Sequence, residues 1–508
     1  MAAGSIISGG RERRDCEERA RRAASGFRAL GVAAGDAVAL LLRNDFAFFE
    51  AAVGACHLGA SPVALNWHLA RPEIAYVLAD SNAKIVVAHA DLLDVVGEAI
   101  PRDVTLLVVE TPPELRAAYS LEAHLGAPRT GQMDWDDWLA GYEPLAEIER
   151  RFTDAMIYTS GTTGKPKGVR RFPQAPETAE KFLRLRDQIY GIRPNMRALI
   201  CGPLYHSAPN AFGMRCVSAA EIIVLMPRFN PLTFLKLVEK HRITTVFMVP
   251  TMFARLLKLP PDERARFDVS SLEYVLTAAA HCPPDIKAAM QDWFGPIVHE
   301  FYGSTESSYV AYCNAQDSVR KPGTVGRLVE GVTLRVLDEA GREVAQGERG
   351  ELYTSLDIAP EFTYNNRQAD RDALEIDGLL ATGDIGYLDE DGYLFLCDRR
   401  RDMVISGGVN IYPAEIECEL IAMKEVNDCA VFGIPDPEFG EKLMAVVQFR
   451  QGMRASEGDI VSFLKTRLAG FKVPRIIEIR DDLPRDDSGK IYKRMISEPY
   501  WADQQRRA

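Results

Sequence analysis

Residues 158–168 combine hydroxyl, glycine and lysine side chains in a pattern suited to binding a polyphosphate. The segment reads Tyr-Thr-Ser-Gly-Thr-Thr-Gly-Lys-Pro-Lys-Gly and overlaps the end of an apolar run at residues 155–159. Glycines let the backbone approach a ligand closely, hydroxyls donate hydrogen bonds, and lysines neutralise negative charge. The segment is not a Walker P-loop, because the spacing Gly-x-x-x-x-Gly-Lys-Ser/Thr is missing from it and Pro166 follows Lys165. Composition alone leaves a phosphate loop and an ordinary surface loop both open.

Four further polar motifs follow along the chain. Residues 301–306 read Phe-Tyr-Gly-Ser-Thr-Glu, residues 381–386 read Ala-Thr-Gly-Asp-Ile-Gly, Asp398-Arg399 precedes Ser-Gly-Gly-Val-Asn-Ile-Tyr-Pro-Ala-Glu at 406–415, and residues 484–490 read Pro-Arg-Asp-Asp-Ser-Gly-Lys. With residues 158–168, these motifs resemble those of the adenylate-forming enzymes: acyl-CoA synthetases, 4-coumarate:CoA ligases, luciferases and the adenylation domains of non-ribosomal peptide synthetases. The five motifs stand in the order usual for that family, and the resemblance spans about residues 20–495.

The resemblance implies a site for ATP and Mg²⁺. The loop around the β- and γ-phosphates corresponds to Thr159, Ser160, Gly161, Thr162, Thr163, Gly164 and Lys167. The nucleoside is implied to contact Ala279, Ala280, Glu300, Tyr302, Gly303, Thr305, Asp384 and Arg399, the last two at the ribose. Glu306 is implied to ligate Mg²⁺, because this cation prefers hard oxygen ligands. Taken alone, Asp384 or Arg399 would instead read as part of a surface ion pair, and Glu300 stands where many relatives carry glutamine.

Three further residues gain a role only through the resemblance. Lys490, after Ser488-Gly489, reads alone as a solvated turn lysine. In the family, a mobile C-terminal domain brings this lysine to the site, where it stabilises the charge shared by the attacking carboxylate and the nucleotide. His206 corresponds to a gate beside the acyl carboxylate, with a packing histidine as the alternative. Gly408 is implied to border the tunnel for coenzyme A.

Short apolar runs alternate with helical patterns over the first 300 or so residues. Predicted strands are 37–42, 85–88, 104–109, 155–159, 199–204, 222–226, 245–249, 274–280 and 297–301, and predicted helices include 15–30, 232–241 and 284–293. This alternation is typical of buried parallel strands with crossover helices. We predict an α/β protein with a large N-terminal domain at 1–398, a hinge at 399–402 and a mobile α+β lid domain at 403–508. The large domain should contain doubly wound subdomains and a small β-barrel-like part near 325–397.

Composition narrows the setting in which the protein works. The 508 residues include 60 Lys+Arg and 72 Asp+Glu, and the resulting net charge of −12 argues against a large nucleic-acid surface. The nine cysteines are scattered and never spaced Cys-x-x-Cys, which favours reduced thiols in the cytoplasm over a disulfide framework or a zinc ribbon. Neither a signal peptide nor a membrane-spanning segment is expected. A homodimer stays open.

The implied activity has two steps. A carboxylic acid reacts with ATP to give acyl-AMP and pyrophosphate, and coenzyme A then displaces AMP. A carrier protein as the acceptor, a luciferase-like oxygenase and an adenylate-binding regulator without activity are the alternatives. An amino-acid-activating domain is disfavoured, because residues 205–214 lack the acid that an α-ammonium requires. Small uncharged residues dominate 207–213, 277–280 and 307–311, which predicts a wide pocket for a medium- or long-chain, bulky aryl or polycyclic acid.

Overall fold

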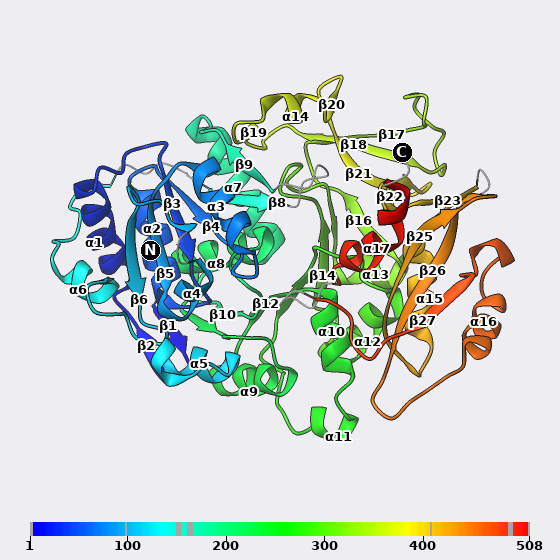
Figure 1. Ribbon diagram of the computed structural model, residues 1–508, viewed down its shortest axis with the longest axis horizontal. Coiled ribbons are helices and arrows are strands. Elements are labelled where there is room, and N and C mark those ends of the chain that lie inside the picture. The colour runs from blue at the N-terminus through cyan, green and yellow to red at the C-terminus, as the bar shows by residue number, and fades with distance from the viewer. Residues whose placement is uncertain are drawn as a thin grey trace.

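The computed structural model describes residues 4–96, 99–148, 154–159, 166–406, 409–485 and 491–505. Three β-sheets organise these residues (Figure 1). Two of them share one hydrophobic core in the N-terminal body, whereas the third forms the C-terminal domain with a core of its own.

The first sheet begins with parallel strands and continues with antiparallel ones. Its strand order is β17-β18-β21-β22-β16-β15-β14-β13-β12-β10-β11-β1-β2, with β20 beside β21. The parallel part contains β1 (Ser5–Ser8), β10 (Arg197–Ile200), β11 (Ile222–Leu225), β12 (Thr245–Met248), β13 (Tyr274–Thr277) and β14 (Val298–Tyr302), with β2 (Arg11–Arg13) antiparallel at the edge. The antiparallel part contains β15 (Ala311–Cys313), β16 (Thr324–Leu328), β17 (Val332–Leu337), β18 (Gly350–Leu356), β20 (Glu375–Ile376), β21 (Leu379–Leu388) and β22 (Tyr393–Arg399).

We predicted a small barrel-like part near 325–397, and the antiparallel strands there share a hydrophobic cluster of their own, which includes Val325, Val336, Leu352 and Leu394. β15 pairs with β14 on one side and with β16 on the other, so this region extends the parallel sheet edge to edge. The hairpin patterns were read correctly, but a local pattern does not reveal which distant strand a hairpin will join.

The second sheet has the order β19-β9-β8-β4-β3-β5-β6-β7. Its strands are β3 (Ala37–Leu41), β4 (Ser61–Ala64), β5 (Ala83–His89), β6 (Thr105–Val109), β7 (Met133–Asp134), β8 (Met156–Thr159), β9 (Lys167–Arg171) and β19 (Phe362–Tyr364). The central strands are apolar and buried on both faces, as expected for parallel strands covered by helices.

Helices cover both sheets (Figure 1). They are α1 (Cys16–Ala29), α2 (Phe46–His57), α3 (Arg71–Ser81), α4 (Leu93–Val96), α5 (Pro113–Tyr119), α6 (Trp135–Ala140), α7 (Pro176–Tyr190), α8 (Ser207–Ala219), α9 (Pro231–His241), α10 (Pro250–Leu257), α11 (Pro261–Arg264), α12 (Pro284–Phe294), α13 (Ala315–Arg320) and α14 (Gln368–Asp372). Proline lies in the first turn of α3, α5, α7, α9, α10 and α12, where its fixed φ favours helix entry and its missing N–H has no helical partner to lose.

Asn44 joins the two sheets of the body. This residue follows β3 and is 2 % exposed. Its amide nitrogen donates to the carbonyl oxygens of Gly202, at 2.9 Å, and Met226, at 3.3 Å. Its side-chain oxygen accepts from the backbone N–H of Leu204 at 3.0 Å. One buried amide therefore fixes the ends of β10 and β11 against the end of β3.

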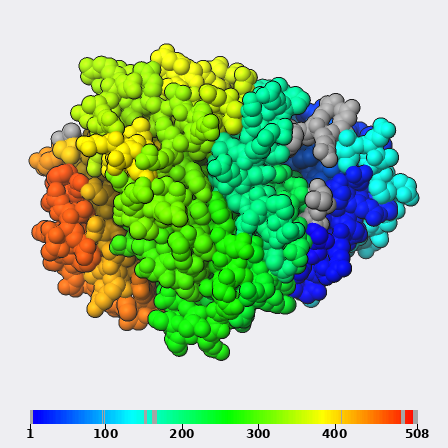
Figure 2. Space-filling model, turned by 180° about the vertical axis from the view of Figure 1, so that it is seen from behind, coloured from blue at the N-terminus to red at the C-terminus, as the bar shows by residue number. Residues whose placement is uncertain are grey.

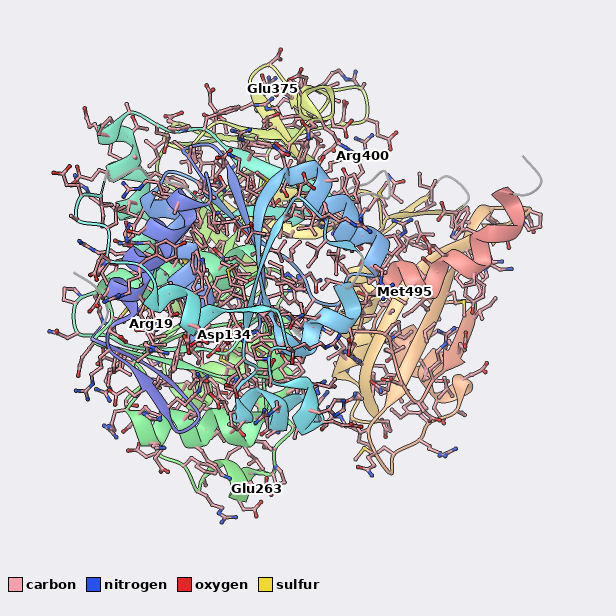
Figure 3. All side chains as sticks on the ribbon, turned by 60° about the vertical axis from the view of Figure 1, so that its left-hand side comes forward. Arg19, Asp134, Glu263, Glu375, Arg400 and Met495 are labelled. Carbon is pink, nitrogen blue, oxygen red and sulfur yellow. The ribbon has the colours of Figure 1, made fainter. Side chains whose placement is uncertain are left out.

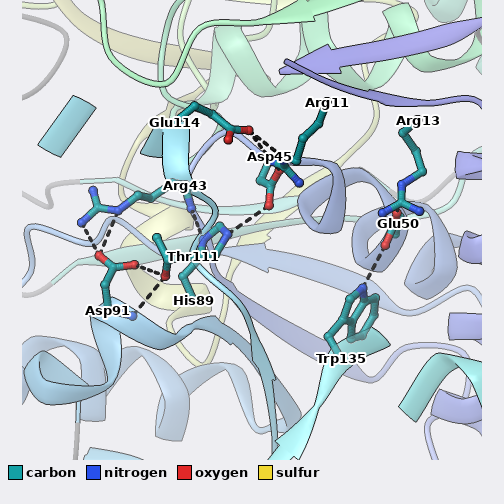
Figure 4. Close-up of polar contacts among 10 residues, drawn as sticks. All are labelled: Arg11, Arg13, Arg43, Asp45, Glu50, His89, Asp91, Thr111, Glu114 and Trp135. Carbon is teal, nitrogen blue, oxygen red and sulfur yellow. Dashed lines mark hydrogen bonds and ion pairs between the residues drawn. The ribbon is translucent and has the colours of Figure 1, made fainter. Parts of the chain in front are cut away.

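Buried charges near Asn44 are matched by partners (Figure 4). Arg43 donates two hydrogen bonds to Asp91, which also accepts from the hydroxyl of Thr111 at 2.7 Å. Asp45 is paired with Arg11 at 2.6 Å and lies 3.3 Å from the ring of His89. Because burying an uncompensated charge is costly, these pairs are best read as supports for the strand ends.

The C-terminal domain surrounds the third sheet, of order β24-β23-β26-β25 with β27 beside β26. Its elements are β23 (Val404–Ser406), β24 (Val409–Ile411), α15 (Pro413–Ala422), β25 (Val426–Asp436), β26 (Gly440–Phe449), α16 (Glu457–Lys465), β27 (Ile476–Ile479) and α17 (Lys493–Gln505). In Figure 2 this domain packs beside the green and yellow part of the body, away from the blue N-terminal residues. Figure 3 places Arg400 between Glu375 of the body and Met495 of α17.

A few polar contacts hold the C-terminal domain to the body. Asp398 accepts from the backbone N–H of Ala414 at 2.8 Å, and Lys258 donates to the backbone oxygen of Asn427 at 3.0 Å. The change from the first sheet to the third falls between β22 and β23, in the stretch where we predicted the hinge. Among the helices described, none has the length and apolar composition needed to cross a bilayer.

Candidate active site

Tyr302, Asp384 and Arg399 meet at the end of β14. The Tyr302 hydroxyl donates to Oδ2 of Asp384 at 2.6 Å, and Nε of Arg399 lies 3.1 Å from Oδ1. Asp384 and Arg399 lie opposite each other in the β21–β22 register. Strand pairing therefore brings these two motifs into contact, although they are separate in the sequence. Burial raises the pKa of the Tyr302 hydroxyl, and the neighbouring Asp384 carboxylate raises it further. The ring therefore stays neutral, as a face for stacking requires.

The backbone beside these residues is tightly constrained. Ala279, in the segment after β13, has a φ of +73°, a left-handed conformation that alanine rarely adopts. At Gly303, an added Cβ would lie 1.9 Å from the backbone oxygen of Ser308, so only glycine fits. A flat ligand could therefore lie directly against the backbone at Ala279, Ala280 and Gly303.

Glu300 has a partner that the sequence did not suggest. Its buried carboxylate accepts from the ammonium of Lys287, on α12, and Lys287 also donates to the backbone oxygen of Thr324 at 3.3 Å. Burial raises the pKa of Glu300, while Lys287 opposes that rise. The adenine contact stays a prediction. Lys287 could have been noticed as a lysine on the same helical face as the apolar Met290.

Glu306, which follows β14 of the first sheet, lies among hydroxyl groups from the second sheet. Its Oε1 accepts from Oγ1 of Thr159, at the end of β8, at 3.2 Å and from the hydroxyl of Tyr364, on β19, at 3.0 Å. Lys167, the first residue of β9, places its ammonium 4.9 Å from the centre of the Tyr364 ring and 3.1 Å from Oδ2 of Asp370. The structure therefore brings together Thr159, Lys167 and Glu306, and adds Tyr364 and Asp370, which we had not predicted.

A partly buried ion cluster braces Thr305. Arg171, at the end of β9, donates to the backbone oxygen of Thr305 at 2.9 Å and to Asp154 at 3.4 Å. Asp154 also receives two hydrogen bonds from Arg186 of α7, at 2.8 and 3.0 Å. Burial alone would raise the pKa of Asp154, but the two guanidinium groups hold it below its usual range. Burial lowers the pKa of Arg171, with Asp154 opposing the shift.

His206 immediately precedes α8, and its ring centre lies 4.4 Å from that of Tyr205. The Tyr205 ring packs edge-on against Trp67 at 4.5 Å. The position borders the predicted acyl segments, but no contact among the described residues tests whether His206 acts as a gate.

A buried aromatic cluster lies in the core beside α8. Its ring centres are 5.5 to 6.5 Å apart, and its members are Tyr190, Phe212, Phe247, Phe301 and Tyr309. Phe212 and Tyr309 belong to the segments whose small residues suggested open space, but both rings are packed inside the core. The width of the substrate pocket stays a prediction.

Seven predicted site residues lie outside the described part of the chain: Ser160, Gly161, Thr162, Thr163, Gly164, Gly408 and Lys490. Their roles stay predictions. Arg485 and Ile491, which flank the segment containing Lys490, face each other in an isolated antiparallel bridge.

The donor set around Glu306 fits a magnesium ion that arrives with a nucleotide. Within the described ranges, no group of three or more His, Cys, Asp and Glu side chains is placed to hold a metal ion. Glu306 offers a single carboxylate with hydroxyl oxygens around it. Mg²⁺ binds through one or two carboxylates plus substrate phosphates, so one carboxylate is enough when the phosphates supply the rest.

Two family models match this chain. The AMP-binding enzyme model matches residues 13–357, and the model for the AMP-binding enzyme C-terminal domain matches residues 415–490. The chain belongs to the AMP-binding enzyme family. The matched ranges contain Lys167, Glu306 and Tyr302 in the first model and the lysine loop that ends at Lys490 in the second.

Curated relatives in this family are similar over nearly their whole length. Feruloyl-CoA synthase of Amycolatopsis sp is 34 % identical over 94 % of this chain and 92 % of its own length. The long-chain-fatty-acid–CoA ligase FadD13 of Mycobacterium tuberculosis is 32 % identical, over 95 % and 92 %. Among solved structures, the anthranilate CoA ligase AuaEII in complex with anthranoyl-AMP superposes with a TM-score of 0.84 at 26 % identity, covering 99 % of this chain and 95 % of that one.

Proposed function

We propose that this AMP-binding enzyme is an ATP-dependent acid–CoA ligase, which converts a carboxylic acid into its acyl-AMP and then into its CoA thioester. The main observation behind this proposal is the meeting of Tyr302, Asp384 and Arg399 at one end of a site with Lys167 and Glu306 at the other. The first group suits a nucleoside and the second suits its phosphates. Relatives named as CoA ligases, similar over more than 90 % of this chain, agree with this reading.

In the first step, a carboxylate oxygen of the acid attacks the α-phosphorus of ATP. The bond from that phosphorus to the bridging oxygen breaks, and pyrophosphate leaves with the electron pair. Asp384 accepts hydrogen bonds from the ribose hydroxyls while Tyr302 stacks on the base. Lys167 and, from outside the described residues, Lys490 offset the negative charge that gathers on the phosphates. A bound Mg²⁺, held by Glu306, would further neutralise that charge.

In the second step, the thiol of coenzyme A attacks the acyl carbonyl and AMP leaves. The mixed anhydride is already activated and a free thiol has a pKa near ~8.5, so no dedicated base is required. We propose that the C-terminal domain rotates between the steps about residues 399–402 and brings Gly408 to the thiol entrance. The few polar contacts of this domain with the body are compatible with such a rotation.

We propose that the acid is apolar, either a medium- or long-chain acid or a bulky aryl or polycyclic one. The core beside α8 contains buried aromatic rings, among them Phe212 and Tyr309, and a charged substrate group buried beside them would carry a large desolvation penalty. Feruloyl-CoA synthase is named for an aryl acid, whereas FadD13 is named for long-chain acids, so the relatives leave both classes open.

The experiment is a panel of acids assayed for ATP-dependent pyrophosphate release with and without coenzyme A. Ferulate, benzoate, decanoate, palmitate and acetate separate the classes. Pyrophosphate release with the preferred acids in the absence of coenzyme A, followed by formation of the thioester once coenzyme A is added, supports the ligase. Acyl-AMP that accumulates unchanged with coenzyme A points to a carrier protein. Oxygen uptake points to a luciferase-like oxygenase, and nucleotide binding without turnover points to a regulator.

For the acid panel, the Asp384→Asn variant provides the matched control, because it keeps the shape of the side chain while removing the charge at the ribose.

We place the enzyme in the cytoplasm, where reduced thiols persist; no disulfide joins the described cysteines. Light scattering of the purified protein would test the homodimer.

A further inference from the structure

Asp370 forms an ion pair with a residue of the phosphate end. Its Oδ2 lies 3.1 Å from the ammonium of Lys167 and 3.6 Å from Nη1 of Arg367. The Lys167 side chain is 9 % exposed, whereas that of Asp370 is 36 % exposed. One carboxylate therefore faces two cations from a position that solvent and solutes can reach.

The backbone fixes Asp370 beside the start of β9. β19 pairs with β9 with Tyr364 opposite Val169, and the backbone N–H of Asn365 donates to the oxygen of Gly168 at 2.8 Å. The side-chain amides of Asn365 and Asn366 both donate to the backbone oxygen of Asp80. α14, which carries Asp370, follows directly after these anchors. The ion pair is thus built into the join between the two strands.

We propose that Asp370 is an internal substitute for phosphate, which holds the ammonium of Lys167 until a nucleotide arrives and takes it back when pyrophosphate leaves. This inference rests on the proposed function, since it needs Lys167 to contact the phosphates. A carboxylate and a phosphate oxygen are both anions, so they repel each other and compete for the same ammonium. The hydrogen bond from Lys167 lowers the pKa of Asp370, which keeps the carboxylate ionised at neutral pH.

The Lys167–Asp370 pair opposes the binding of ATP and favours the release of pyrophosphate. The pair must break before Lys167 can contact ATP, and this cost weakens ATP binding. The pair forms again when pyrophosphate leaves after the first step, which favours that release. Asp370 therefore sets how tightly the phosphate end holds polyphosphates in general, and its removal should tighten both ligands together.

The experiment measures dissociation constants of pyrophosphate and of ATP by calorimetry for the full chain and for Asp370→Asn. Neutralising one partially exposed carboxylate should tighten both ligands about two- to five-fold, the range measured for exposed ion pairs. The Asp370→Glu variant keeps the charge and should bind like the parent. Asp372→Asn, at the end of the same helix, removes an equal charge that accepts from Gln368 instead and should change neither constant.

The inference is overturned if Asp370→Asn binds pyrophosphate as weakly as the parent, or more weakly, or if Asp372→Asn tightens it equally. If the Asp370→Asn protein fails to fold, Asp370→Ser is measured in its place. If the parent binds neither pyrophosphate nor ATP, the inference is also wrong. If the parent binds both but makes no thioester from any acid, the proposed function fails while the exchange at Lys167 stands.

Discussion

The two ends of the proposed nucleotide site are built differently. At the nucleoside end, Tyr302, Asp384 and Arg399 come from strands of the first sheet, and the β21–β22 register places two of them opposite each other. At the phosphate end, Thr159, Lys167 and Tyr364 come from the second sheet, whereas Glu306 follows a strand of the first.

This difference has a physical consequence. Strand pairing alone preserves the nucleoside end, so its geometry should survive small movements between the sheets. The phosphate end depends on how the sheets pack, and therefore on joining contacts such as those of Asn44 and of Arg171 with Thr305. Changes at the nucleoside end should then act through binding of the ligand itself, and changes at the phosphate end through alignment.

The largest effect is expected for Asp384→Ala. Loss of a carboxylate that accepts charged hydrogen bonds should lower kcat/KM for ATP roughly 10- to 100-fold, because each such bond contributes about 1.5–3 kcal/mol. The variant should also lose its preference for ATP over 2′-deoxy-ATP. Steady-state kinetics with both nucleotides provide the measurement. Equal use of the two nucleotides by the unchanged protein would remove Asp384 from the ribose.

Glu306→Gln should come next, with an effect confined to the phosphate end. Removal of the single carboxylate should raise the magnesium concentration needed for half-maximal activity by about tenfold, in line with the loss of one charged contact. Magnesium titrations at fixed ATP test this expectation. Tyr364→Phe, which removes a hydroxyl donor to Glu306 but no charge, is the matched control and should shift the titration much less. A normal magnesium dependence in Glu306→Gln would assign the ligand elsewhere.

Arg171 should act as a positioning residue, since it reaches the site only through Thr305. Arg171→Met should lower kcat about tenfold, as expected when one hydrogen bond to a charged group is lost. It should change KM for the acid little. Arg171→Lys should restore part of the rate, because a cation can still reach the carbonyl oxygen. A Met variant with a raised KM and an unchanged kcat would mean that Arg171 contributes to binding instead.

The smallest expected effect is on the pH dependence of folding stability, through His299 on β14. This strand leads to both the nucleoside end and the phosphate end of the proposed site. Burial lowers the pKa of His299 to about 4. The His299 ring stacks on the Tyr274 ring, with the ring centres 4.2 Å apart. Its Nδ1 forms a hydrogen bond of 2.8 Å with the hydroxyl of Tyr312. In the unfolded chain the pKa is near ~6.5. Below that value the unfolded chain binds a proton that the folded chain does not, so stability should fall by roughly 1 kcal/mol between pH 6.5 and 5. Unfolding by urea at several pH values, with His299→Gln as the control, measures the loss; a loss of the same size in the variant would exclude His299 as its source.

The sequence predicted the parts of the site that motifs define locally. The parallel strands appeared as apolar runs, and the order of the motifs identified the family that the comparisons then established. The structure brings Tyr302 into contact with Asp384 and Glu306 into contact with Thr159, and the roles of these residues stay predictions. Lys490 and most of the phosphate loop stay predictions, because they lie outside the described residues.

What the sequence missed are partners contributed from far along the chain. Arg171 meets the backbone of Thr305, 134 positions away, and no local pattern marks such a contact. Tyr364 and Asp370 became part of the site only because β19 joins the edge of β9. The aromatic cluster beside α8 was missed for a related reason: the residue sizes in three segments do not show that rings from α7 and β12 will pack against Phe212 and Tyr309.

The pairing of β1 with β11 has a consequence for how the protein is made. Residues 5–8 are synthesised before their partner strand, residues 222–225, which emerges more than 200 residues later. At about 5–20 residues per second, the ribosome needs roughly 10 to 40 s to supply it. During that time β1 can pair only with β2, its neighbour in the chain, and its apolar Ile6 must wait uncovered. β1 thus reaches its final place in the sheet long after it is translated, and the growing chain must be kept from aggregating until then.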